Sequence, residues 1–312
     1  MRTRLAGFKN HKFEILLSFF TILLVFSPYI REDLIIGSDS PFHLARIETL
    51  KQNLLYGIFP TKLHVDICYG YGYGVGFFYP DFFLYIPAFF RILGLSLEVS
   101  FKLFAGLIQA GIYFSVYYCI YRLTYDRFAS LSSAVVYLFS NQVLVSFYYD
   151  FTLGTSLGLI FMPLAICGMY LFLYRDQKPY MLGIGFTGLI FSHVLSTALA
   201  LFACTLLLII QLAKRAISFR KIGILSITVI LVSGLTACFW LPMIEQFLMQ
   251  KFRVSQPWTY IDDNTFPLVN LFFTNGLGWV FTIIIFLIGF CIITPPPVPE
   301  NMPPVPLTGS NS

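Results

Sequence analysis

The sequence predicts an all-α, polytopic membrane helical bundle of about eight transmembrane helices with a long outer first loop. Hydrophobic residues make up 57% of the 312 residues and charged residues only 11%, and the mean hydropathy is +0.78. This composition leaves too little polar surface to cover a soluble globule of that length. The Lys and Arg residues stand in short clusters between apolar runs, which is typical of a membrane topology signal and excludes a nucleic-acid-binding protein.

Long apolar runs give the number of predicted spans. Those long enough to cross a hydrocarbon core of about 30 Å cover residues 13–30, 99–121, 127–147, 153–174, 222–241 and 270–293. Another run, Pro179 to Ala213, is too long for one ordinary helix and is polar at Ser192–His193. It therefore predicts two short helices that meet at that polar pair.

The basic clusters predict the orientation of the chain. Residues 1–12 are basic, which places the N-terminus in the cytoplasm, and the span at 13–30 has no small-x-small cleavage site, so we expect a retained signal anchor. The basic turns further along should also be cytoplasmic; they contain Arg122, Arg127, Arg175, Lys178 and the cluster Lys214, Arg215, Arg220 and Lys221. A multi-pass protein of the cell membrane follows, with Asp150, His193 and Glu245 on its extracytoplasmic face.

Residues 31–98 form the outer loop in this topology, and residues 99–293 form the transmembrane helical module. Within the loop, residues 77–94 (FFYPDFFLYIPAFFRILG) have the composition of a span, but a full crossing would invert every later segment. The prolines Pro80 and Pro87 favour an interfacial or re-entrant helix instead. The alternative is a ninth span.

The start of the outer loop contains a candidate acid–base and anion-binding set. Ser40 followed by Pro41 predicts an N-cap and a first turn, so a helix should begin there and bring His43 and Arg46 within one turn. Asp39, just before this helix, could act as a general base or metal ligand. His43 could transfer protons, and Arg46 could bind phosphate. An alternative of equal weight is that Asp39 only caps the helix and Arg46 meets lipid headgroups.

Glycine alternates with tyrosine in residues 69–83, YGYGYGVGFFYPDFF, before an aromatic run. Tyrosine faces could stack on a sugar or an isoprenoid, but tyrosine-rich segments at a membrane interface usually form an aromatic belt, which we favour. The segment is not a phosphate-binding glycine loop, because no Lys-Ser/Thr pair follows it.

Three more polar residues on the outer face are candidates for substrate binding. Asp150 lies at the outer end of a span, where a carboxylate needs a partner or a solvated cavity. His193 could contact phosphate, or it could simply be hydrogen-bonded between helices. Glu245, at the end of the next span, could also mark only the water boundary. If a divalent metal such as Mg²⁺ or Mn²⁺ takes part, Asp39 and Asp150 are its candidate ligands.

The remaining features are interpreted as structural. The six cysteines are scattered and form no CxxC pair, so we expect small apolar residues rather than metal ligands. Residues 294–312 are rich in proline and should form a disordered tail.

Three stretches carry a further signal. They are SDSPFHLARIETLKQNLLYGIFP with the following YGYGVGFFYPDFFLYIPAFFRILGLS; DFTLGTSLGLIFMPLAICGMYLFLYR with the later FSHVLSTAL; and LTACFWLPMIE. Together they cover most of residues 30–250. In these stretches the chain resembles the GT-C superfamily of membrane glycosyltransferases, and more closely the YfhO-like and 6-pyruvoyl-tetrahydropterin-synthase-related bacterial membrane proteins.

The resemblance implies transfer of a sugar from a polyprenyl-phosphate-linked donor to a glycan, lipid or protein acceptor on the extracytoplasmic face. It implies that Asp39, which matches the acidic residue just after the first span, deprotonates or orients the acceptor. It also places His43, Arg46 and His193 near the donor phosphate, with Asp150 as a looser match to a second acidic position. The chain departs from the family by being short, because its members usually continue with more helices.

Two other functions stay open, a transporter or flippase of a lipid-linked substrate and a catalytically inactive membrane scaffold. A transporter is expected to carry charged residues at the centres of its spans and to show an inverted repeat. The predicted spans have almost no central charges, and no repeated half is visible in the sequence. This pattern favours a site at the outer face.

Overall fold

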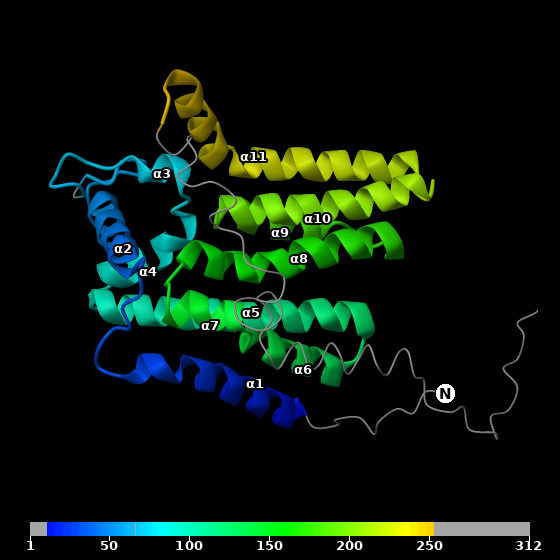
Figure 1. The fold of residues 1–312 in the computed structure, drawn as a ribbon, viewed down its shortest axis with the longest axis horizontal. Coiled ribbons are helices and arrows are strands. Elements are labelled where there is room, and N and C mark those ends of the chain that lie inside the picture. Colours follow the sequence, from blue (N-terminus) through cyan, green and yellow to red (C-terminus); the bar gives the residue numbers. More distant parts are fainter. Residues whose placement is uncertain (1–10, 66, 253–312) are drawn as a thin grey trace, which may run out of the picture. The chain divides into compact units, whose positions relative to one another are not determined.

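The computed structural model describes residues 11–65 and 67–252, and every regular element among them is helical apart from an isolated bridge between His64 and Tyr73. The elements, labelled in Figure 1, are α1 (His11–Phe26), η1 (Ser27–Ile30), α2 (Ser40–Leu55), α3 (Val75–Phe78), η2 (Phe82–Leu84), α4 (Tyr85–Ile92), α5 (Leu97–Thr124), α6 (Arg127–Leu138), α7 (Asn141–Tyr148), α8 (Leu153–Arg175), α9 (Tyr180–Ile190), α10 (Val194–Ala213) and α11 (Phe219–Met249). The predicted all-α class is confirmed for the described residues.

Five helical segments are long and apolar enough to cross a membrane: Lys12–Ile30, α5, α8, α10 and α11. The pair α6 and α7 passes the same test together but bends by 45° at its break, so it is either a sixth, broken span or a re-entrant loop. These helices indicate a multi-pass membrane protein. The described residues therefore supply five or six spans of the eight expected; the predicted span at 270–293, the tail at 294–312 and residues 1–10 lie outside the described part.

The predicted division of the run 179–213 is confirmed, because α9 ends at Ile190 and α10 begins at Val194. With 11 residues, α9 is about 17 Å long, which is short of a hydrocarbon core of about 30 Å. It lies directly against α8, where a Cβ atom added to Gly168 or Gly185 would collide with the backbone of the other helix. Glycine at these two positions allows the close helix packing that is common in membranes.

Local capping explains where the long helices begin and end. The Ser96 hydroxyl accepts a hydrogen bond from the Val99 backbone N–H at the start of α5, and Asp126 accepts one from Ala129 at the start of α6. At their C-terminal ends, Tyr125 after α5 and Asp176 after α8 adopt left-handed backbone conformations. Such residues close a helix by returning the chain in a tight turn.

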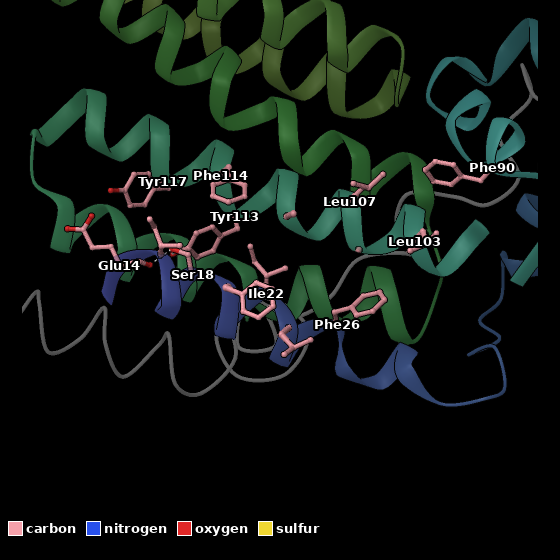
Figure 2. Close-up of a pocket in the computed structure, with 15 residues that line it drawn as sticks. Glu14, Ser18, Ile22, Phe26, Phe90, Leu103, Leu107, Tyr113, Phe114 and Tyr117 are labelled. Atoms are coloured by element: carbon pink, nitrogen blue, oxygen red, sulfur yellow. Dashed lines mark hydrogen bonds between the residues drawn. The ribbon is translucent and has the colours of Figure 1, made fainter. Parts of the chain in front are cut away.

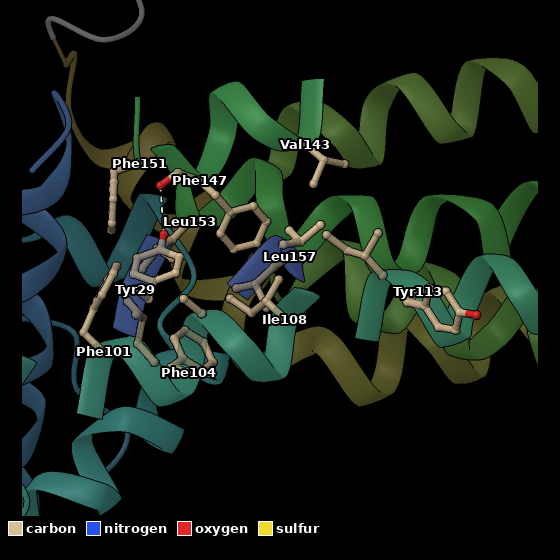
Figure 3. Packing of buried hydrophobic residues seen from close by; sticks show 14 of the residues in the cluster. Tyr29, Phe101, Phe104, Ile108, Tyr113, Val143, Phe147, Phe151, Leu153 and Leu157 are labelled. Atoms are coloured by element: carbon tan, nitrogen blue, oxygen red, sulfur yellow. Dashed lines mark hydrogen bonds between the residues drawn. The ribbon is translucent and has the colours of Figure 1, made fainter. Parts of the chain in front are cut away.

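The largest buried apolar cluster of the described residues joins α1, α2 and α4 to α8, and Figure 3 shows part of it. The ring of Phe101 stacks on that of Phe151 with 4.9 Å between centroids. The Tyr29 hydroxyl lies within the same cluster and donates a 2.8 Å hydrogen bond to the Phe147 carbonyl. A buried hydroxyl needs such a partner, so this bond fixes the end of the first span against α7.

The segment 77–94 does not form a long helix. It is divided into α3, η2 and α4, and the apolar helical stretch Phe82–Ile92 is too short to be among the possible spans. With α2 it lies at one end of the long helices (Figure 1), and an ion pair of 2.9 Å between Glu48 and Arg91 joins α2 to α4. The segment is therefore not among the possible spans, and its placement as an interfacial or re-entrant helix stays a prediction.

Helix α11 is linked to the first loop at an interruption of its hydrogen bonding. Pro242 lies inside this helix and cannot donate to the carbonyl four residues earlier, that of Cys238. The Lys62 ammonium donates a 3.0 Å hydrogen bond to this carbonyl. Beyond the proline, Phe247 packs edge-on against Phe78 of α3 with 5.0 Å between ring centroids.

The bend between α6 and α7 leads to a test of topology. In a variant without native cysteines, single cysteines replace Tyr125 and Tyr149, which are 66% and 75% exposed at the two ends of the pair. If the pair is a broken span, an impermeant thiol reagent should label these two positions from opposite sides of sealed vesicles. Labelling of both from one side would instead establish a re-entrant loop.

Candidate functional site

The first loop is attached to the end of α7 by backbone contacts that bring two acidic residues together. The backbone N–H of Asp39 and the hydroxyl of Ser38 each donate a 3.0 Å hydrogen bond to the Asp150 carbonyl. A Cβ atom added to Gly37 would lie 2.5 Å from the Tyr149 carbonyl oxygen, so this close approach requires glycine. Asp39 and Asp150, predicted separately on one face, thus become neighbours.

The Asp39 carboxylate is not used to cap α2. Asp39 occupies the N-cap position, one residue before the predicted Ser40, but its side chain makes no capping hydrogen bond. The Ser40 hydroxyl instead accepts a 2.7 Å hydrogen bond from the Gly37 backbone N–H. The alternative that the Asp39 side chain only caps the helix is therefore wrong for this structure.

The environment of Asp39 favours its protonated form. The side chain is partly exposed, yet partial desolvation and then the nearby negative charge of Asp150 raise the pKa of its carboxyl. Both effects oppose a charged carboxylate. A carboxylate with a raised pKa accepts a proton more readily than an ordinary aspartate does, as general-base catalysis requires.

Arg46 forms a buried ion pair with a residue that the sequence did not indicate. Its guanidinium donates to one carboxylate oxygen of Asp81, from Nη2 at 2.6 Å and from Nε at 3.0 Å, and it also donates to the Pro80 carbonyl at 2.9 Å. The other Asp81 oxygen lies 2.9 Å from Nε2 of His64. Because Arg46 is fully buried, the alternative that it meets lipid headgroups is wrong. Its guanidinium is paired with Asp81, whereas the sequence predicted that it binds phosphate.

The pKa values of this cluster follow from burial and charge. Burial alone would raise the pKa of Asp81, but the hydrogen bond from His64 and the charge of Arg46 outweigh it and hold that pKa below its ordinary value. Burial, and then the positive charge of Arg46, lower the pKa of His43 to about 3. His43 is therefore neutral at physiological pH, and the distance from its Nδ1 to Nη1 of Arg46 is 3.3 Å.

Tyr79 connects this buried cluster to His193. The Arg46 guanidinium lies over the Tyr79 ring, 4.4 Å from its centroid, and the rings of His43 and His193 lie at 6.0 Å and 6.3 Å from Tyr79. Tyr79 is much less exposed than Tyr69 in the same aromatic stretch. An aromatic belt thus remains compatible with the exposed residues Tyr69, Tyr71 and Tyr73, whereas Tyr79 is part of the packed site.

His193 lies at the break between α9 and α10. Its Nδ1 is 2.8 Å from the Ser196 hydroxyl on the first turn of α10. A Cβ atom added to Gly154 would lie 3.1 Å from the His193 ring and still closer to the Tyr79 hydroxyl. Glycine at the start of α8 therefore makes room for both side chains, and the predicted residue His193 lies next to the cluster.

Glu245 is less closely connected to the other predicted residues. It is exposed on α11, beyond Pro242, and no hydrogen bond or ion pair in the described part of the chain joins it to Asp39, Asp150 or His193. Substrate binding by Glu245 stays a prediction that rests on its position alone.

Two observations bear on metal binding. Across residues 11–65 and 67–252, no three His, Cys, Asp or Glu side chains are grouped so that they could hold a metal ion. The cysteines described in this part are free thiols; Cys68 and Cys238 are exposed, against expectation, and the others are buried. In this part of the chain, Asp39 and Asp150 thus have no third His, Cys, Asp or Glu grouped with them. Binding of a metal by this pair stays a prediction.

An apolar groove begins beside the cluster. It has a volume of about 630 Å³ and follows α9 between α8 and α11. At one end are Phe82 and Phe191, whose rings stack 4.5 Å apart and which adjoin Asp81 and Ser192 in the sequence. Lys178 lies at the other end. The aromatic end of the groove thus lies close in the sequence to Asp81 and His193.

Removing the charge of Asp81 should destabilise the protein strongly. The substitution Asp81→Asn keeps the size of the side chain but leaves the Arg46 guanidinium buried without a counter-charge, which costs about 3–5 kcal/mol. Unfolding in detergent micelles measures the loss. The control is Glu98→Gln, whose partner Lys102 is bound at a partly exposed ion pair and which should lose about 1 kcal/mol or less. Equal losses for both variants would contradict the role of the buried pair.

Gly37 offers a second test, of the contact that joins the first loop to α7. Gly37→Ala should destabilise the protein by about 1–3 kcal/mol, because the new methyl group must displace the backbone at Tyr149. The matched control is Gly223→Ala on α11, where an added Cβ meets open space and should be neutral or stabilising. Unfolding midpoints in the same detergent compare the two, and a neutral Gly37→Ala would exclude the close contact.

Comparison with known proteins gives one relative. The chain is 27% identical over 288 residues to a protein of Lactococcus lactis subsp. cremoris (strain MG1363) that is described only as an uncharacterized protein. The match covers 88% of this chain and 44% of the relative, so the chain spans less than half the length of that protein. No protein-family model matches the chain, and no solved structure matches it.

Proposed function

We propose that this chain is the helical module of a membrane glycosyltransferase that transfers a sugar from a polyprenyl-phosphate-linked donor to a hydroxyl acceptor. The observation that carries the proposal is the pair Asp39 and Asp150. These residues are held together by backbone hydrogen bonds across the fold, and the pKa of Asp39 is raised. The pair stands beside an aromatic and histidine cluster at the end of a membrane bundle, where a lipid-borne substrate is accessible.

Asp39 is the general base in this reaction. Its carboxylate takes the proton of the acceptor hydroxyl while the acceptor oxygen attacks the anomeric carbon of the sugar. The bond between that carbon and the phosphate oxygen breaks, and polyprenyl phosphate leaves with the bonding electrons. Partial desolvation and then the negative charge of Asp150 keep the pKa of Asp39 high. If a divalent metal takes part, this pair would supply its carboxylate ligands.

Tyr79 and His193 are the groups that we place nearest the donor phosphate. Both can donate hydrogen bonds to phosphate oxygens, and each lies within three residues in the sequence of a residue that lines one end of the apolar groove, Phe82 or Phe191. Arg46 and His43 are buried behind Tyr79, so in this proposal they are positioning residues that hold its ring. The sequence predicted that Arg46 and His43 contact the phosphate directly. In this proposal they instead hold the Tyr79 ring in place, and Tyr79 contacts the phosphate.

The groove along α9 supports a lipid-linked donor over a water-soluble one. Its lining is almost entirely apolar and aromatic, and its aromatic end lies close in the sequence to Asp81 and His193. An isoprenoid chain in this groove would gain burial of about 25 cal/mol per Å² of apolar surface. The phosphate would then remain near His193, within reach of the acidic pair.

The charge distribution supports an extracytoplasmic site in the cell membrane. The turns after α5, α8 and α10 lie at the opposite end of the helices from α2 and α3 (Figure 1), and these turns carry the basic clusters of the sequence. Positive charges favour the cytoplasmic side. The end with Asp39 then faces outward.

Replacing Asp39 by Asn tests the proposed base. Transfer is followed as release of polyprenyl phosphate from a radiolabelled polyprenyl-phosphate sugar added to the purified full chain. The loss of general-base catalysis should lower the rate by at least about a hundredfold. Because the native pKa of Asp39 is raised, a neutral side chain should leave the unfolding midpoint at pH 7 unchanged or higher.

The matched control is Glu32→Gln, which removes an exposed carboxylate from the same loop and should leave the rate unchanged. Full transfer by Asp39→Asn would exclude Asp39 as the base. If the unaltered protein moves intact donor across proteoliposome membranes without releasing polyprenyl phosphate, glycosyl transfer is excluded and a flippase is established in its place.

A further inference from the structure

A second apolar groove lies between α1 and α5, at a distance from the candidate site. Its volume is about 750 Å³, and Figure 2 shows the residues that line it, from Glu14 and Ser18 at one end to Phe90 at the other. Apart from Glu14, Ser18 and the tyrosine hydroxyls, the lining side chains are apolar. On α5 the lining includes Gly106 and Ala110; an added Cβ at Gly106 would lie 3.1 Å from the Phe26 ring.

The length of the groove fits one hydrocarbon chain. On α1 its lining extends from Glu14 to Phe26, twelve residues apart, which corresponds to about 18 Å at the helical rise of 1.5 Å per residue. Half of a hydrocarbon core of about 30 Å is about 15 Å. A single extended acyl chain from one leaflet therefore covers the groove when its head group lies beside Glu14.

At the Glu14 end of the groove, charged side chains are placed where they could bind the polar head group of a lipid. Glu14 is 9% exposed, and its Oε1 atom is buried without a hydrogen-bond partner. Among residues 11–65 and 67–252, the cation paired with Glu14 is Nη1 of Arg127 on α6, at 3.7 Å from Oε1, which is a long ion pair. The Arg127 side chain is 40% exposed. A buried carboxylate oxygen without a donor is costly, so a ligand that supplies an N–H donor would satisfy it.

We propose that this groove binds one phospholipid whose head carries both a phosphate and a primary ammonium, as in phosphatidylethanolamine. The ammonium donates to Oε1 of Glu14, the phosphate pairs with Arg127, and one acyl chain lies along α1 and α5 as far as Phe90. A lipid with a quaternary ammonium has no N–H donor for Glu14, and a lipid with an anionic head would place negative charge beside it. The Glu14 carboxylate thus selects the lipid by its head group, and the apolar lining of the groove binds the acyl chain.

This lipid site is independent of the proposed sugar transfer. Glu14 lies in the first turn of α1, whereas Asp39 follows the opposite end of that span, so the two sites are at different ends of the bundle (Figure 1). The bound lipid fills the space between α1 and α5 and holds the first span against the rest of the module. Its proposed role is binding and stabilisation of that contact.

Native mass spectrometry of the purified full chain in detergent tests the proposal. Three lipids with the same acyl chains are added separately: phosphatidylethanolamine, phosphatidylcholine and phosphatidylglycerol. One charge-assisted hydrogen bond should make the affinity for phosphatidylethanolamine about tenfold higher than for phosphatidylcholine. Because this comparison uses the unaltered protein, it does not depend on the folding of any variant.

Variants then assign the selectivity to its residues. Glu14→Gln should bring phosphatidylethanolamine down to the level of phosphatidylcholine, and Ala110→Phe, which fills the groove, should weaken both. The control Glu98→Gln, at the other end of α5, should bind as the unaltered protein does. Equal binding of all three lipids by the unaltered protein would mean ordinary bilayer lipid and overturn the proposal, as would a preference that survives Glu14→Gln.

Discussion

The ion pair between Arg46 and Asp81 is the interaction on which the candidate site depends. A fully buried guanidinium strongly destabilises the fold unless a counter-charge lies beside it. The α2 helix, which carries Arg46, must therefore lie against the turn that carries Asp81. Asp39 immediately precedes α2, and its position follows from where that helix is held. Tyr79, two residues before Asp81, is brought over the guanidinium by the same pair. The positions of Asp39 and Tyr79 thus follow from a buried contact between two other side chains.

The sequence predicts the long helices well, because lipid requires an unbroken apolar run of spanning length. The bounds of α5 and α8 agree with the apolar runs to within a few residues, and the polar pair Ser192–His193 correctly predicts the break after α9. The bend between α6 and α7 was not predicted. It occurs at Ser140, within a run that contains neither proline nor glycine, so the strongest helix-breaking residues give no signal there.

The partners in the site were harder to predict, because sequence spacing identifies only neighbours on one helix turn. Arg46 was correctly placed near His43, but its main partner, Asp81, lies 35 residues away, and His64 comes from a loop without periodicity. One signal was present in the sequence. A lone aspartate in the aromatic run 77–94 is costly beside lipid unless it is paired, and Arg46 is a nearby basic residue that could pair with it.

The loop holds two carboxyls whose pKa values are shifted in opposite directions, and this difference separates their roles. The lowered pKa of Asp81 means that its charge stabilises the fold above its unfolded-state pKa and that this stability is lost as the pH falls through its native pKa. The raised pKa of Asp39 has the opposite effect on stability. The contribution of Asp39 to folding stability is favourable at low pH and is lost as the pH rises through the pKa of Asp39 in the folded protein. At neutral pH the charged Asp39 is therefore a cost to folding. Asp81 offsets that cost from the same loop. Asp81 is therefore the structural carboxylate, and Asp39 is the one to which the proposed function assigns a role as base.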